Sequence, residues 1–325
     1  MYWHKSLDKL LCQLAQGLPL TDCEQAYLAE FLPVNLLRIN EIEVFQLIPQ
    51  IYGRLQQFAN QFSLNLNWQN VWRFYAPLSV FILAQKSPFF LGIVGMQGTG
   101  KTTLSLMLKH ILEQCDRSVL CLSLDDLYKT FADRQALQQR DPRLRWRGVP
   151  HTHDVELGLE LFHAIRHSRY PLAVPRFDKS LQAGAGDRTT AEIINNPIDV
   201  VVFEGWFVGA HCLPNLPPDC SQFTQDCNQN LKDYQPLWQF LDYLVALIPS
   251  NYADSLQWRQ SAEMKQIQQG KAGMSPTEVT AFVEYFWQAL PPEIYLPDLA
   301  QRADLVVRLN SDRQIVSITT GSANN

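Results

Sequence analysis

A glycine-rich segment in the first third of the chain has the residue types and spacing of a phosphate-binding loop. Gly95, Gly98 and Gly100 precede Lys101 and Thr102, which complete the pattern Gly-x-x-x-x-Gly-Lys-Thr. Such glycines let backbone N–H groups turn toward a phosphate, the lysine reaches the β- and γ-phosphates, and the threonine hydroxyl is a ligand for Mg²⁺. The segment follows an apolar run and opens a helical pattern. We therefore expect the chain to bind a nucleoside triphosphate.

Two adjacent aspartates, Asp125 and Asp126, follow a second apolar run, Ser118–Leu124. In an open parallel sheet, ligands bind beyond the carboxyl ends of the strands, so a carboxylate at this point faces the γ-phosphate and any acceptor hydroxyl. Asp125 is therefore the candidate general base. The alternative is that an aspartate here caps the following helix, a common use of this residue. The sequence leaves open which of the two is the base.

A third apolar run, Val200–Phe203, ends in Glu204 and Gly205. This pattern is typical of the strand that brings a carboxylate beside Mg²⁺ in phosphoryl-transfer enzymes. The alternative is a salt bridge to a neighbouring lysine, since a buried strand seldom ends in an unpaired carboxylate. We predict that Thr102 and Glu204 hold the metal ion.

Three cations lie in the glycine-rich segment Pro175–Arg188, namely Arg176, Lys179 and Arg188. Their number suits a small anionic substrate, and the two arginines are favoured because a planar guanidinium forms a forked pair with a carboxylate. A solvated surface loop is the alternative interpretation. These three residues are the candidates for binding the substrate's acidic group.

The segment just upstream contains two histidines, His151 and His153. It has the composition of a helix N-terminus, with Thr152 or Asp154 as the cap. The two-residue spacing, with no third ligand nearby, argues against a metal pair. We keep His153 as a further candidate for binding the substrate.

The composition excludes several classes of protein. Hydrophobic residues make up 46% of the 325 residues and charged residues 18%, which excludes a disordered chain. A net charge of -5 gives no electrostatic footprint for duplex nucleic acid, and no apolar run approaches the roughly 18 residues that span a bilayer. Seven scattered cysteines form no CxxC pair, which favours a reducing compartment. With no targeting signal, we expect a cytoplasmic monomer without nucleic-acid or membrane partners.

The elements that position these residues alternate between strands and helices after a helical start. Residues 1–86 have helical apolar spacing, and residues 87–325 are predicted to form one α/β domain with a lid at about 251–290. Near-continuous apolar runs, typical of parallel strands covered on both faces, predict strands at Phe89–Val94, Ser118–Leu124, Pro197–Phe203, Tyr243–Ile248 and Asp304–Leu309, with an antiparallel edge strand at Gln314–Ile318. Helices are predicted near Val155–Arg166, Leu231–Leu241, Tyr252–Gln268 and Pro276–Leu290. The fold class is therefore α/β, with a mostly parallel sheet flanked by helices and an N-terminal helical region.

Several segments together resemble the D-glycerate 3-kinase family of the plant and cyanobacterial type. They are GMQGTGKTT, SLDDLYKT, RGVPHTHDVELGLE, PRFDKSLQAGAGDR, VVVFEGW, NLKDYQPLW, WRQSAE and GKAGMSPTEV, spread over residues 89–309. This family belongs to a larger group of P-loop kinases with phosphoribulokinase, uridine kinase and pantothenate kinase. Two residues depart from the family pattern: Leu127 stands where relatives usually have phenylalanine, and His151 stands where a glycine is expected.

The resemblance implies ATP-dependent phosphorylation of D-glycerate at its 3-hydroxyl, to give 3-phospho-D-glycerate and ADP, in photorespiratory carbon salvage. It implies that Asp125 is the acid after the second strand, that Glu204 lies beside Mg²⁺, and that Arg259, with Lys271, belongs to a lid that closes over the phosphates. The residues that it implies for nucleotide binding are Gly95, Gly98, Thr99, Gly100, Lys101, Thr102 and Thr103.

Two alternatives remain open beside this function. A kinase of another small alcohol, such as uridine or pantothenate, shares the nucleotide site, but the cationic segment Pro175–Arg188 suits a small acid better than a nucleoside. A nucleotide-binding scaffold without turnover is the second alternative. Asp125 argues against it, because a switch protein needs no base for an acceptor alcohol.

Overall fold

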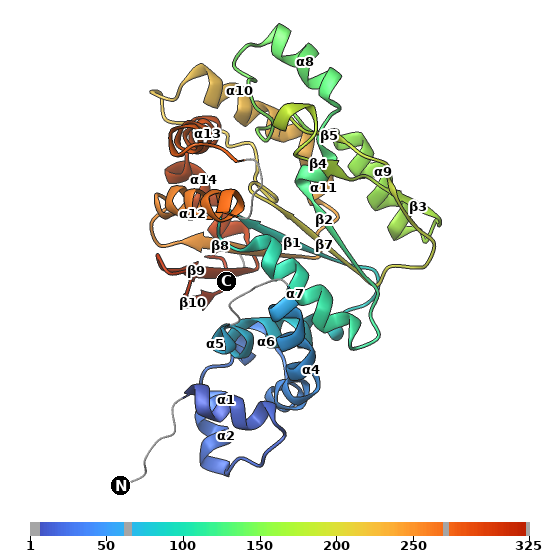
Figure 1. Cartoon of the computed structure of the whole chain (residues 1–325), viewed down its shortest axis with the longest axis vertical. Helices are drawn as coiled ribbons and strands as arrows, with labels where there is room; N and C mark the ends of the chain where they lie inside the picture. Colours follow the sequence, from blue (N-terminus) through green and yellow to red (C-terminus); the bar gives the residue numbers. More distant parts are fainter. Residues whose placement is uncertain (1–6, 62–66, 269–272, 323–325) are drawn as a thin grey trace.

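The chain begins with a helical layer. The computed structural model describes residues 7–61, 67–268 and 273–322 (Figure 1). Helical apolar spacing produces the first helices, and a π-helical turn, Val71–Tyr75, joins the last two of them. These helices are α1 (Leu7–Ala15), α2 (Asp22–Ala29), α3 (Val34–Leu37), α4 (Glu41–Gln61), α5 (Trp68–Asn70) and α6 (Ala76–Leu83).

A six-stranded sheet follows, in the order β10-β9-β8-β1-β7-β2. The strands are β1 (Phe89–Gly95), β2 (Val119–Ser123), β7 (Val200–Gly205), β8 (Tyr243–Pro249), β9 (Leu305–Leu309) and β10 (Ile315–Thr319). Strands β2, β7, β1, β8 and β9 pair in parallel, and β10 pairs with β9 antiparallel. The prediction of a mostly parallel sheet with an antiparallel edge strand is confirmed.

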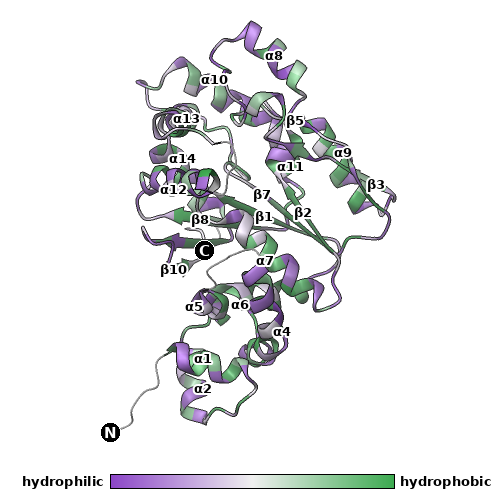
Figure 2. Ribbon diagram, viewed as in Figure 1, coloured by the Kyte–Doolittle hydropathy of each residue, from purple (hydrophilic) through white to green (hydrophobic). Residues whose placement is uncertain are grey.

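Helices cover both faces of this sheet (Figure 1). Along β1, Phe90 and Val94 face one hydrophobic cluster and Leu91 and Ile93 face the other, as the alternation of side chains along a strand requires. The central strands are accordingly the hydrophobic centre of the molecule (Figure 2). The helices of this part are α7 (Lys101–Glu113), α8 (Phe131–Arg140), α9 (Val155–Arg166), α10 (Gln222–Asn230), α11 (Gln235–Trp238), α12 (Asp254–Gln268), α13 (Pro276–Ala289) and α14 (Pro292–Arg302).

Helix α7 lies between the sheet and the N-terminal helices. Its residues Leu104 and Leu108 are buried in the cluster that includes the sheet residues Leu91 and Val202. Its residues Met107 and Ile111 are buried in a third cluster, which contains Trp72 and other residues of the N-terminal helices. The helix that follows the glycine-rich loop is thus anchored on two sides.

Two of the predicted elements differ clearly in extent from the structure, and helices α8, α10 and α14 were not predicted. The strand predicted at Pro197–Phe203 is β7 (Val200–Gly205), because its parallel pairing with β1 continues to Gly205 and carries Glu204 into the strand. The helix predicted near Leu231–Leu241 is a 3₁₀ turn, Leu231–Tyr234, followed by the short α11. No helix in the described part of the chain has both the length and the apolar character needed to cross a bilayer.

The cationic segment Pro175–Arg188 forms a small antiparallel hairpin outside the main sheet. Its strands are β4 (Phe177–Asp178) and β5 (Asp187–Arg188), and a 3₁₀ turn with several left-handed residues connects them. A second small pair, β3 (Leu172–Val174) and β6 (Glu192–Ile194), lies beside it in the chain. This hairpin brings the cationic segment to the 3₁₀ helix that follows β2, with which β4 is in contact.

Candidate active site

The glycine-rich loop connects the end of β1 to the start of α7. Gly98 and Gly100 have φ of 78° and 92°, a region that favours glycine. Gly95 has no room for a side chain, since a Cβ there would meet the Leu247 carbonyl oxygen at 2.9 Å. The Lys101 ammonium donates a hydrogen bond to the Met96 carbonyl at 3.0 Å, which folds the side chain across the loop. The loop therefore has the backbone shape that the motif predicts.

Thr102 and Glu204 meet at the first turn of α7 and the end of β7. The Thr102 hydroxyl donates to Glu204 Oε1 at 2.9 Å, and Glu204 is only 8% exposed. Burial raises the pKa of the Glu204 carboxyl, and the Lys101 charge opposes this shift. A hydroxyl and a carboxylate oxygen are hard donors of the kind that Mg²⁺ takes together with phosphate oxygens and water. The two residues fit the predicted metal site in chemistry and placement.

Asp125 and Asp126 have different surroundings in the 3₁₀ helix Leu124–Leu127. Asp126 Oδ2 accepts a hydrogen bond from the Ser123 backbone N–H at 3.0 Å and thereby completes a capping box. Asp125 instead accepts from the Tyr128 hydroxyl at 2.6 Å through Oδ1 and pairs with the Lys179 ammonium at 2.6 Å through Oδ2. Asp126 is thus the capping aspartate, and Asp125 is the one that remains as the candidate base.

Asp125 shares an electrostatic environment with the glycine-rich loop. Burial raises the pKa of its carboxyl, but the charge and hydrogen bond of Lys179 and the hydrogen bond from Tyr128 outweigh this effect, so the pKa lies well below its usual range. The Asp125 carboxylate in turn raises the pKa of Lys101, which burial lowers overall. The two strand ends therefore place a partly buried carboxylate that stays ionised in the electrostatic environment of the phosphate-loop lysine.

The cationic candidates have different partners. Arg176 donates to Glu192 Oε2 at 2.9 and 2.6 Å and to Asp126 Oδ2 at 3.1 Å. Arg188 donates to Asp154 Oδ2 at 2.9 Å and to the Tyr128 carbonyl at 2.8 Å. Both guanidinium groups thus pair with oxygens of the protein itself in this structure, and their predicted contact with a substrate stays a prediction.

Lys179 is the cationic candidate that contacts Asp125. Its side chain is 61% exposed, although its ammonium reaches the partly buried carboxylate. The loop that follows Lys179 turns through Gly184 and Gly186, both with positive φ. Of the three candidate cations, Lys179 is therefore the one that combines solvent access with contact to the candidate base.

His153 is 2% exposed and contacts Tyr128, the residue that donates a hydrogen bond to Asp125. Its Nδ1 is 2.8 Å from the Tyr234 hydroxyl, which also accepts a hydrogen bond from the His151 backbone N–H. The ring stacks on Tyr128 with a centroid distance of 4.6 Å, and Nε2 has no hydrogen-bond partner among the residues that the structure describes. Burial lowers the pKa of His153 to about 3, even though Asp125 opposes this shift.

The buried neutral histidine makes stability depend on pH. Between pH of about 6.5 and 3 the unfolded chain protonates this residue and the folded chain does not, so each unit of acidification removes about 1.4 kcal/mol from the free energy of unfolding. His153→Gln should flatten the pH dependence by this slope, measured by urea unfolding between pH 6 and pH 4. The control is His163→Gln, on an exposed position of α9. Parallel curves for the wild type and His153→Gln would contradict the buried neutral state.

The predicted lid region includes α12, which lies against the glycine-rich loop. The Trp258 Cβ is so close to Gly98 that no side chain fits between them. The neighbouring Arg259 pairs with Glu263 Oε2 at 2.6 Å on the same helix, and its Nε has no hydrogen-bond partner in the described part of the chain. Lys271, the other lid candidate, lies outside the described residues. Arg259 is therefore held on a helix that touches the loop, through its neighbour Trp258.

Three residues of this region had no role in the sequence analysis. Tyr128 holds Asp125, Tyr234 holds His153, and Trp258 packs on Gly98. All three lie within segments that carry the family resemblance, SLDDLYKT, NLKDYQPLW and WRQSAE. That is the one signal that points to Tyr234 and Trp258, because their partners lie far away in the sequence.

No family model matches the chain, but several individual proteins are similar to it in sequence. The chloroplastic D-glycerate 3-kinase of Arabidopsis thaliana is 31% identical over 223 residues, which are 65% of this chain and 48% of the relative. The chain thus spans about half the length of that protein. The uncharacterized kinase mug58 of Schizosaccharomyces pombe is 32% identical over 237 residues, which are 67% of this chain and 84% of the relative.

A solved structure has the same fold. The D-glycerate 3-kinase from Cryptococcus neoformans var. grubii matches with a TM-score of 0.67 and 26% sequence identity, over 76% of this chain and 98% of that one. The sheet order and the glycine-rich loop between β1 and α7 are those expected of a P-loop kinase. The named relatives are also kinases. The chain belongs to the D-glycerate 3-kinase family of P-loop kinases.

Proposed function

We propose that this protein transfers the γ-phosphoryl group of ATP to the 3-hydroxyl of D-glycerate, giving 3-phospho-D-glycerate and ADP. The observation that carries the proposal is the contact between Asp125 and Lys179 beside the phosphate-binding loop. This contact places an ionised carboxylate next to an accessible cation. A hydroxy acid has a hydroxyl for the carboxylate and an acidic group for the cation. The family relationship supports the same reaction, and we infer from it a role in photorespiratory carbon salvage.

The nucleotide side of the reaction uses the loop after β1. Backbone N–H groups from Gly98 to Thr103 and the Lys101 ammonium bind the β- and γ-phosphates, and Thr102 and Glu204 are the residues that would hold Mg²⁺. When bound, the metal ion neutralises charge on the phosphate oxygens. Arg259 on α12 is the proposed lid cation, which approaches the phosphates as the lid closes and excludes water.

Asp125 acts on the acceptor. Its carboxylate orients the 3-hydroxyl of glycerate toward the γ-phosphorus and accepts the hydroxyl proton as the new oxygen–phosphorus bond forms. The bond between the γ-phosphorus and the bridging oxygen breaks, and ADP leaves with the electron pair of that bond. Tyr128 keeps Asp125 Oδ1 occupied, so the hydroxyl approaches Oδ2, where Lys179 is bound.

Lys179 selects an acidic acceptor in this proposal. When the acceptor hydroxyl takes the place of the ammonium at Asp125, Lys179 loses its carboxylate partner. A substrate that carries its own carboxylate supplies a charged replacement, whereas a neutral alcohol leaves the exposed ammonium to water. The forks of Arg176 and Arg188 already hold Glu192 and Asp154, so they support the hairpin that presents Lys179.

A substrate panel tests the proposed reaction. ADP release by the wild type is measured with D-glycerate, uridine, pantothenate and glycerol as acceptors at saturating MgATP. We expect D-glycerate to give the largest kcat/KM. Preference for uridine or pantothenate would replace the proposal with another kinase activity, and nucleotide binding without acceptor-dependent ADP release would replace it with a scaffold.

Lys179→Met should reduce discrimination between acidic and neutral acceptors. A charge-assisted hydrogen bond is worth about 1.5–3 kcal/mol, so kcat/KM for D-glycerate should fall about 10–150-fold. The value for glycerol should change far less, because glycerol has no carboxylate, and KM for ATP should stay nearly constant. Lys232→Met, at an exposed position after α10, is the matched control. Equal losses with both acceptors would show that Lys179 does not bind the carboxylate.

A further inference from the structure

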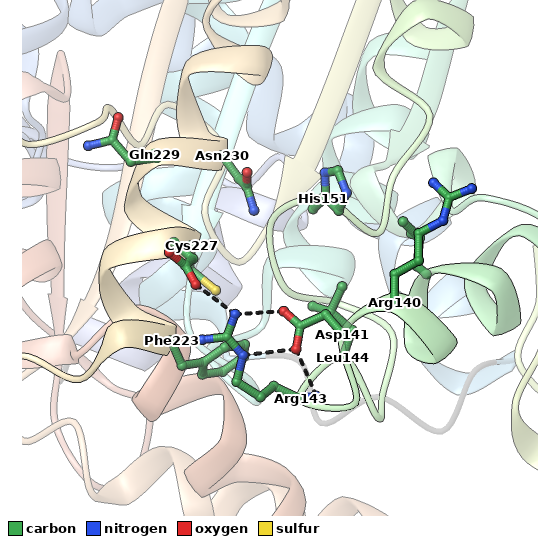
Figure 3. A pocket seen from close by; sticks show the side chains of 11 residues that line it. Arg140, Asp141, Arg143, Leu144, His151, Phe223, Cys227, Gln229 and Asn230 are labelled. Carbon is green, nitrogen blue, oxygen red and sulfur yellow. Dashed lines mark hydrogen bonds and ion pairs between the residues drawn. The ribbon is translucent and has the colours of Figure 1, made fainter.

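A cavity lies away from the phosphate-binding loop. It has a volume of about 310 Å³, is open to solvent on one side, and is lined by the end of α8, the segment that follows α8, His151 and α10 (Figure 3). This volume is at the lower end of the range for small-molecule sites. Phe223 and Leu144 contribute apolar surface, and the remaining lining is mostly polar. None of the candidate catalytic residues lines it.

The carboxylates of this cavity are already satisfied. Arg143 donates to Asp141 at 2.8 and 2.7 Å and to Asp226 at 2.6 Å (Figure 3). The other oxygen of Asp226 accepts a hydrogen bond from Gln222 at 2.9 Å. One wall is therefore a closed network of one cation and two anions, which offers a cationic ligand little unpaired negative charge.

The unused hydrogen-bonding capacity of the cavity consists largely of donors. The side chains of Arg140, His151 and Asn230 line it and form no hydrogen bond or ion pair with the described residues. They come from three different segments, the end of α8, the loop before α9 and the end of α10 (Figure 3). A guanidinium, an imidazole and an amide in the lining of one cavity are donors of the kind that bind the oxygens of a phosphate or carboxylate.

His151 adopts a backbone conformation that ordinarily belongs to glycine. Its φ is 85°, a region that costs a residue with a side chain roughly 1 kcal/mol or more. The same position is the one at which the sequence departs from the glycine of the family pattern. This strained conformation places the imidazole at the cavity. It is held by a hydrogen bond of 3.0 Å from the His151 backbone N–H to the Tyr234 hydroxyl.

We propose that this cavity is a second ligand site, which binds a small organic anion with a phosphate or carboxylate group on a short carbon body. Arg140, His151 and Asn230 bind the anionic group, and Phe223 and Leu144 contact the carbon body. The site is linked to the candidate base through Tyr234, which bonds both His151 and His153, and through the stack of His153 on Tyr128. A ligand at His151 thus has a contiguous route to Asp125.

Calorimetric titration tests the site without requiring turnover, so its result is independent of the proposed kinase reaction. The full chain with Lys101→Ala is used, because this change weakens phosphate binding at the glycine-rich loop. The probes are 3-phosphoglycerate, inorganic phosphate and succinate, of which the last two separate phosphate from carboxylate recognition. We expect at least one of these probes to bind, and Arg140→Ala in the same background to weaken it at least tenfold.

The control is Arg54→Ala, which removes an exposed arginine of α4 and should leave the affinity unchanged. His151→Gly is the second variant, because it removes the imidazole at a backbone position that glycine adopts without strain. It should weaken the same probe and leave the fold intact. Absence of binding by all three probes, or equal affinity with and without Arg140 and His151, would overturn the proposal.

Discussion

Lys101→Ala is expected to abolish measurable phosphoryl transfer while the protein stays folded. The side chain forms one hydrogen bond, to the Met96 carbonyl within its own loop, so its removal opens no cavity in the hydrophobic clusters. Its charge is needed where negative charge develops on the transferring group. Loss of one such donor typically costs about 10²–10³-fold in kcat, and we expect at least this loss here.

The measurement is ADP release with D-glycerate, combined with urea unfolding to verify the fold. Lys86→Ala, at an exposed position just before β1, is the matched control and should keep full activity. A folded Lys101→Ala protein with near-normal activity would contradict the assignment of the loop as the phosphate-binding site.

Asp125→Asn should lower kcat by about 10²–10⁴-fold, the usual effect of removing a general base. The amide keeps the size of the side chain and can still accept the Tyr128 hydrogen bond, so ATP binding should change little. The ion pair with Lys179 is lost, but because Lys179 is largely exposed this should lower stability only modestly. Asp126→Asn should instead affect stability more than kcat. It weakens the capping box with Ser123 and the ion pair with Arg176, which should cost roughly 0.5–2 kcal/mol of stability with a smaller loss of kcat.

The two variants are compared by steady-state kinetics with each substrate varied and by urea unfolding. They control for each other, because they change neighbouring residues of the same type. A larger kcat loss in Asp126→Asn than in Asp125→Asn would show that Asp126, and not Asp125, is the base.

The parts of the site that follow from local patterns were predictable from the sequence. The glycine-rich loop requires positive φ at Gly98 and Gly100, and its lysine and threonine follow at a fixed spacing. Glu204 was predictable because an acidic residue at the end of an apolar run is unusual. The strands β1, β7 and β8 were predictable for a related reason, since burial on both faces leaves a continuous apolar run in the sequence.

The pairing of the cations was not predictable. Arg176 meets Asp126, 50 residues away, and Glu192, 16 residues away, and nothing in the local sequence distinguishes these carboxylates from a substrate carboxylate. The choice is made by the hairpin of β4 and β5, whose register depends on a turn with left-handed residues. The burial of His153 is likewise a result of tertiary packing on Tyr128 and Tyr234.

The anchoring of α7 determines which wall of the nucleotide site can move. Leu104 and Leu108 fix this helix to the sheet, and Met107 and Ile111 fix it to the N-terminal helices, so displacement of α7 would break two hydrophobic layers at once. The other neighbour of the loop is α12, which contacts it through Trp258. The lid movement proposed above for α12 would therefore leave α7 and the N-terminal helices in place.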